Sequence, residues 1–74
     1  MSRLIRMDHT GHTTLAEWTA SDPGSVNAAT LAFERELARG YFGVVSNGEG
    51  HAEQVRVLPP DADLVIMRLP ISGG

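Results

Sequence analysis

The sequence predicts a small α+β domain, in which a mixed sheet of four or five strands carries one helix on one face. Three observations predict it. Apolar residues recur at helical spacing over residues 22–39, segments rich in β-branched and aromatic residues lie on either side, and turn-forming residues separate them. Seventy-four residues suffice for one domain, and a 42% hydrophobic composition supplies a core without any cysteine.

The first two predicted strands, residues 3–8 and 13–18, form a β-hairpin. Both contain residues that favour a half-buried pleated surface, such as Ile5 and Trp18. Gly11 lies between them and supplies the positive φ that a tight turn or bulge requires.

The predicted helix begins near Asp22-Pro23, an N-cap oxygen followed by proline at the first helical position. Ser25 is an alternative N-cap. Arg39 and Gly40 give the helix an ordinary end, because a cation there favours the dipole and glycine enters the left-handed region. The apolar stripe that faces the sheet consists of Val26, Ala29, Phe33 and Leu37.

Three further segments follow the helix. Residues 41–46 read as a strand, and residues 51–58 contain a short alternating piece with Val55 and Val57 on one face and Arg56 on the other. Residues 64–67 are apolar throughout, which is typical of a central strand, so we expect this strand to lie beside and parallel to the first. The predicted core is Ile5, Leu15, Val26, Phe33, Leu37, Val44, Leu64 and Ile66. Trp18 is expected at the edge of this core, with contact to a partner protein as the alternative.

Charge and composition exclude several function classes. The net charge is −3 and no basic stripe is visible, so we expect no nucleic-acid partner. No apolar run approaches the roughly 20 residues of a membrane span or resembles a signal peptide, and we expect a cytoplasmic protein without a membrane partner. All six basic residues are arginine, so no side-chain amine can accept an isopeptide bond.

The end of the sequence carries a resemblance. Residues 58–74 comprise an acidic turn, an apolar strand, and then Pro70-Ile71-Ser72-Gly73-Gly74. This order resembles the ubiquitin-like β-grasp family, and most closely its sulfur carriers, the small subunit of molybdopterin synthase and the thiamine-pathway carriers. The turn around Gly11 is similar to the first hairpin of ubiquitin, but the apolar alternation of residues 3–7 departs from the ubiquitin register.

The resemblance implies a β-grasp domain over residues 1–71 and a flexible tail over residues 72–74. In that family an activating enzyme uses ATP to adenylate the terminal carboxylate, here that of Gly74, which becomes a thiocarboxylate or is transferred to an acceptor. Gly73 is expected to enter the narrow activating channel because it has no side chain. The carrier contributes no catalytic residue, binds no cofactor or metal, and has two partners, the activating enzyme and a sulfur-accepting enzyme or conjugation target.

Residues before the diglycine are expected to dock on the activating enzyme. They are Ser72, Ile71, Pro70 and Arg68, joined by Arg56 if it lies nearby on the sheet. Arginine presents a planar fork that pairs with carboxylates.

Two other readings stay open. The domain is alternatively a binding or assembly module with a non-reactive tail, or a structural adaptor in a larger complex. Asp8, His9 and His12 are crowded on one turn, where neighbouring strand side chains alternate, so we do not expect a metal site there. Charge pairs such as Asp61 and Asp63 are expected to be solvated loop residues.

Overall fold

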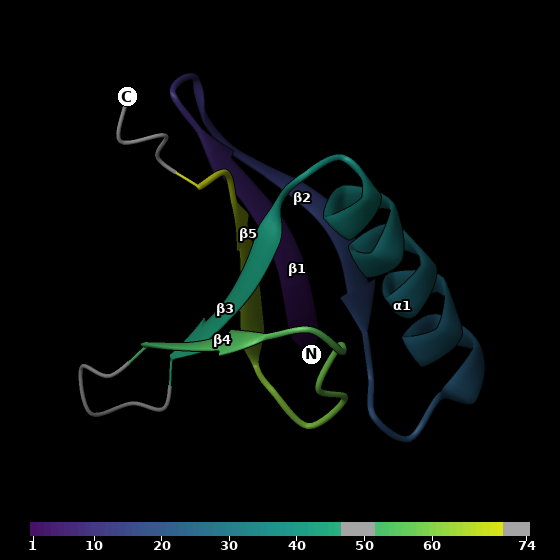
Figure 1. The fold of residues 1–74 in the computed structure, drawn as a ribbon. Helices are drawn as coiled ribbons and strands as arrows, with labels where there is room; N and C mark the ends of the chain where they lie inside the picture. The colour runs from purple at the N-terminus through teal and green to yellow at the C-terminus, as the bar shows by residue number, and fades with distance from the viewer. Residues whose placement is uncertain (47–51, 71–74) are drawn as a thin grey trace.

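The computed structural model describes residues 1–46 and 52–70, and these form the predicted α+β domain (Figure 1). Two strands precede the single helix of these residues and three follow it, which is the expected order. The elements are β1 (Ser2–Asp8), β2 (Gly11–Trp18), α1 (Pro23–Ala38), β3 (Phe42–Ser46), β4 (Ala52–Val55) and β5 (Leu64–Arg68).

The five strands form one mixed sheet in the order β2-β1-β5-β3-β4. β1 and β5 are parallel neighbours, with Leu4 opposite Val65, and the other pairs are antiparallel. The prediction that the first and last strands lie side by side in the centre is therefore confirmed. Because β5 has a strand on each side, its backbone groups can pair in both directions, and its continuous apolar sequence fits that position.

The turn between β1 and β2 is tighter than expected. Gly11, with a φ of 121°, already opens β2, so only two residues connect the strands. The Asp8 carboxylate closes this turn by accepting from both the backbone N–H and the hydroxyl of Thr10. Farther along, the β1–β2 register shifts between Leu4 and Ile5, and the extra residue on β2 forms a bulge.

Capping fixes where the helix begins and ends. The side chain of Asp22 accepts from the backbone N–H groups of Gly24 and Ser25, and Pro23 follows it at the first helical position. Asp22 is thus the N-cap, while the Ser25 hydroxyl instead reaches back to the carbonyl of Thr19. Gly40, with a φ of 96°, follows the C-cap in the left-handed region that stops a helix.

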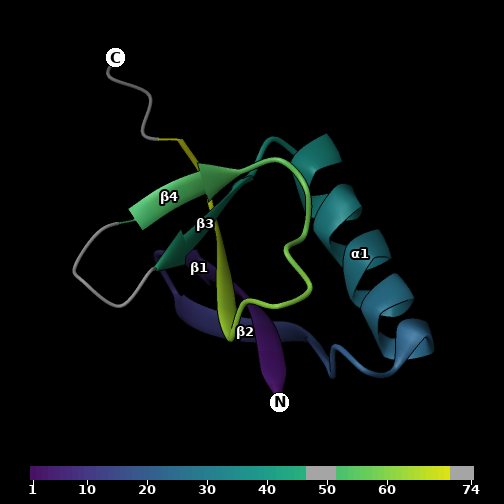
Figure 2. The same cartoon turned by 90° about the horizontal axis from the view of Figure 1, so that it is seen from below.

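The core lies between α1 and one face of the sheet (Figure 2). No helix among the described elements covers the opposite face. The Trp18 indole is almost completely buried and donates to the carbonyl of Pro60 at 3.0 Å, which holds the loop before β5 against the core. The buried cluster consists of Leu4, Trp18, Ala29, Phe33, Leu58, Val65 and Met67.

The predicted core is wrong in the face it assigns to three strands. Val65 and Met67 face the helix, whereas their neighbours Leu64 and Ile66 lie on the uncovered face, as does Val44. The apolar run of β5 offers either face to the core, so alternation could not choose between them. Phe33 is buried as predicted, and Leu15, Val26 and Leu37 are half-buried against the core. Ile5 is buried, but on the far side of β1.

The segment after β4 also differs from its prediction. β4 ends at Val55, and the side chain of Val57 is 75% exposed rather than sharing a face with it. The chain bends after Val55 because it must return to the start of β5, and it buries Leu58 instead. The alternation of apolar and polar residues in the sequence therefore continues past the end of β4 and does not mark where the strand stops. Trp18, predicted at the edge of the core or in contact with a partner protein, is instead buried inside the core.

Gly43 gives a test of the packing. A Cβ at this position would lie 2.6 Å from Cε2 of Phe33, a ring with no free space in the core. We expect Gly43→Ala to lower the free energy of unfolding by about 1–3 kcal/mol, the usual cost of overpacking. In a Phe33→Leu background the added cost should fall to about half or less, since the ring edge is gone. Urea unfolding of the four chains measures this coupling, and strictly additive costs would contradict the proposed contact.

Candidate functional site

The predicted docking residues begin where β5 ends. Arg68 is the last residue of β5, and Leu69 and Pro70 carry the chain away from the sheet. Pro70 has no backbone donor, so the ladder cannot continue through it. Four of the predicted site residues lie outside the described part of the chain: Ile71, Ser72, Gly73 and Gly74.

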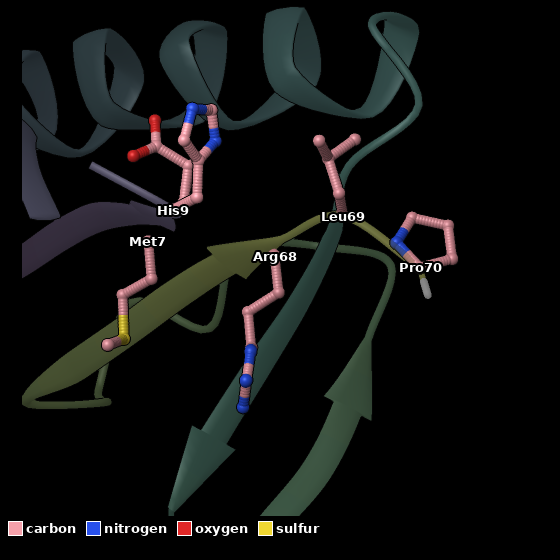
Figure 3. A pocket seen from close by; sticks show the side chains of 6 residues that line it. Met7, His9, Arg68, Leu69 and Pro70 are labelled. Atoms are coloured by element: carbon pink, nitrogen blue, oxygen red, sulfur yellow. The ribbon is translucent and has the colours of Figure 1, made fainter. Parts of the chain in front are cut away.

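A shallow notch lies at this end of the sheet, between the β1–β2 turn and the departing chain. Its volume is about 330 Å³. The residues lining it are Met7, Asp8, His9, Arg68, Leu69 and Pro70 (Figure 3). Two of them were predicted as docking residues, Arg68 and Pro70. The notch exists because β1 and β5 run parallel, so that the turn after β1 meets the end of β5.

Side chains enter the notch from both faces of the sheet. Met7 pairs with Arg68 in the β1–β5 register, and their side chains lie side by side on the uncovered face (Figure 3). His9 and Leu69 point to the other side of these strands in the same view. The thioether of Met7, 41% exposed, and the isobutyl group of Leu69, 49% exposed, give the notch apolar surface beside the Arg68 guanidinium.

Arg68 is the cation of the notch that remains available. Its side chain makes no ion pair or hydrogen bond within the described residues. Arg56 follows Val55, which pairs with Gly43, while the adjacent Phe42 pairs with Arg68. Both arginines therefore lie toward the same end of the sheet, but β3 separates β4 from β5, so a shared docking role for Arg56 stays a prediction.

The carboxylate of the notch is already occupied. The hydroxyl and backbone N–H of Thr10 both donate to Asp8 and lower its pKa below the ordinary 3.8, and the positive charges of His9 and Arg6 act in the same direction. Asp8 thus stays ionised at neutral pH, and its carboxylate stabilises the β1–β2 turn by accepting from Thr10. The notch accordingly offers a cation and apolar surface to a ligand or partner.

A charged cluster lies behind the notch, between β1 and the end of α1. The Glu36 side chain is only 6% exposed, and it accepts from Arg6 Nη1 at 3.1 Å and from Arg39 Nη1 at 3.4 Å. Both guanidinium groups also lie over the Tyr41 ring, 5.9 and 5.8 Å from its centroid. Because a buried carboxylate needs its partners, this cluster fixes the helix end relative to β1.

Sequence reasoning did not identify this cluster. Glu36 does not belong to the predicted apolar stripe, and Arg6 and Glu36 are 30 residues apart. The signal that existed was weak: Arg6 interrupts an apolar strand at a position that faces the helix. Met7, Asp8, His9 and Leu69 were also not recognised as notch residues, because only the parallel pairing brings them together.

Comparison with family models, curated proteins and solved structures finds no match for this chain. Within residues 1–46 and 52–70, no group of three or more His, Cys, Asp or Glu side chains could hold a metal ion. The described helix is too short and too polar to cross a membrane. The geometry of the notch is therefore what bears on function.

The Asp8–Thr10 contact predicts a pH effect. Thr10→Ala should raise the pKa of Asp8 toward 3.8, because the hydroxyl donor is lost while the backbone donor stays. A lowered folded-state pKa stabilises the protein above the unfolded value, and this contribution disappears as the pH falls through the folded value. The variant should therefore lose stability at neutral pH and approach the parent chain as the pH falls through the lowered folded-state pKa of Asp8. NMR titration of the Asp8 carboxyl measures the pKa directly, and an unchanged value would contradict the role of the hydroxyl.

Proposed function

We propose that this chain is a ubiquitin-like β-grasp carrier whose C-terminal diglycine is activated by a separate adenylating enzyme. The observation that supports it best is the position of β5, a central strand that ends at Arg68, shortly before Gly73-Gly74 in the sequence. Five strands in this order with one helix on one face are compatible with the β-grasp type.

The chemistry follows from the tail. The activating enzyme attaches the Gly74 carboxylate to the α-phosphorus of ATP, with pyrophosphate as the leaving group. Attack of a sulfide-level sulfur nucleophile on the acyl carbon of the adenylate releases AMP and gives a thiocarboxylate, and attack by a nucleophile of an acceptor releases AMP and gives a conjugate. The chain itself supplies no acid, base or nucleophile, and ATP belongs to the enzyme. Glycine suits this position because it lets the backbone approach an enclosed site closely.

The notch supplies a place for the enzyme to dock. Arg68 would pair with a carboxylate of the enzyme, while Met7 and Leu69 accept an apolar side chain beside it. This contact would hold the base of the tail, so that the residues from Ile71 onward reach the active site. We place the protein in the cytoplasm, where such an enzyme has ATP, and expect its second partner to be a sulfur-accepting enzyme or conjugation target.

The test is ATP–pyrophosphate exchange with the cognate activating enzyme. Deleting Gly74 moves the carboxylate back by about 3.3–3.6 Å, outside the tolerance of a reaction whose atoms must lie within about 3–3.5 Å. We expect exchange to fall at least ~100-fold, the scale on which a misplaced reacting group costs rate. Gly73→Val should be similarly harmful, because a branched side chain must enter the channel.

A matched pair of variants separates docking from chemistry. Arg68→Glu should raise KM about tenfold, the effect of losing about 1.4 kcal/mol of binding, with kcat little changed. Arg35→Glu reverses a charge on the helix and should leave both constants alone. Full activity in the Gly74 deletion would overturn the carrier proposal, whereas an unchanged Arg68→Glu variant would overturn only the docking contact.

One observation favours the second candidate, a β-grasp binding module with a non-reactive tail. The uncovered sheet face carries Ile5, Val44 and Ile66 in one row, and no described element packs on it. A module of this kind would bind through that face with or without Gly73-Gly74. Loss of function on deletion of the diglycine is therefore the result that separates the two candidates.

A further inference from the structure

The side of α1 that packs on the sheet ends in a charged residue. The buried residues of this helix are Ala29, Phe33 and Glu36. Their spacing of four and then three residues places them along one line of the helix surface. A carboxylate thus takes the last position of this line, where a helix that faces a core normally carries an apolar side chain. The next residue, Leu37, is only half-buried.

The apolar sequence of α1 favours a different rotation of the helix about its axis. The stripe that the sequence predicts contains Leu37 in the last turn and leaves Glu36 out. Neighbouring residues of a helix lie about 100° apart, so a rotation by part of that angle would bury Leu37 and carry Glu36 toward solvent. Ala29 and Phe33 belong to both arrangements, and their burial therefore does not choose between them.

The contact that holds Glu36 inward comes from the sheet. Arg6 on β1 donates from Nη1 to Glu36 Oε1 at 3.1 Å. Arg39 reaches Glu36 Oε2 at 3.4 Å, but it lies three residues away at the same helix end and moves with it. Rotation toward Leu37 would break the Arg6–Glu36 bond. The Arg6 side chain, only 22% exposed, would keep just its 3.9 Å contact with Asp8 as an ion pair among the described residues.

We propose that the Arg6–Glu36 pair is a conformational device that selects the rotation of α1 on the sheet. Two charges lose solvation when they are buried, which offsets most of their attraction, so an apolar pair of similar size would hold the helix about as firmly. An apolar pair would not distinguish the two rotations, because it packs against any apolar neighbour. The charged hydrogen bond forms in one arrangement only, as polar residues at a buried position fix the register of coiled coils.

The device does not depend on the diglycine, so its failure and that of the carrier proposal are separate results. It does reach the notch. The guanidinium that binds Glu36 at the helix end also lies 3.9 Å from Asp8, which lines the notch. The rotation of α1 and the turn wall of the notch therefore share one side chain.

Apolar replacement of the pair tests the device. Arg6→Leu and Glu36→Leu should each lower the midpoint of urea unfolding, because each leaves a charge without its main partner. The double variant should return the midpoint to that of the parent chain or above it. Its NMR spectra should nevertheless show the rotated helix, as a second set of α1 amide signals or as new nuclear Overhauser contacts from the Leu37 methyl groups to the sheet.

A matched control changes the same residue types on the exposed side of the helix. Glu34→Leu combined with Arg35→Leu removes the same two charges and should keep the parental contacts of Leu37. An Arg6→Leu, Glu36→Leu chain with one set of signals and parental Leu37 contacts would overturn the proposal, because packing alone would then select the rotation. A double variant that is as unstable as its weaker single variant would also overturn it, since the pair would then supply stability.

Discussion

The parallel pairing of β1 with β5 is the constraint on which the other features depend. It joins segments about 60 residues apart and places them in the middle of the sheet. With this pairing, the turn after β1 lies beside the end of β5, and the notch forms between them. It also stacks Ile5 on Ile66 on one face and Leu4 on Val65 on the other. Sequence-distant pairing of this kind is entropically costly to close, so the buried Leu4 and Val65 must supply much of its stability.

The order of the helix and strands was predictable because short local sequence signals determine where each element begins and ends. Asp22-Pro23 marks the helix start and Gly40 its end, and Gly11 marks the hairpin. Which side chains of each strand face the helix was not predictable. Leu4-Ile5 and the run from Leu64 to Met67 present apolar groups on both faces, so the choice depends on which side α1 packs. That choice is fixed by contacts far apart in sequence, such as Phe33 against Gly43 and Arg6 with Glu36.

The same limit applied to the candidate site. Pro70 and Arg68 were identified because the end of the chain has a recognisable pattern. Asp8 and His9 carried no such pattern, and they joined the site only through the fold. Arg6 illustrates the reason most clearly. A cation on a strand is normally predicted to be solvent-exposed, yet the Arg6 guanidinium binds the Glu36 carboxylate, whose side chain is 6% exposed. The same guanidinium lies over the Tyr41 ring. No local spacing encodes that contact.

The position of Trp18 has a practical consequence. It is the single tryptophan of the chain, and its indole is buried and bonded to the loop that precedes β5. Its fluorescence therefore originates in the core, on the side of the sheet that α1 covers. Emission will follow the closing of the loop before β5 onto the sheet. The chain thus carries an intrinsic optical reporter of folding that is separate from the surfaces proposed for its function.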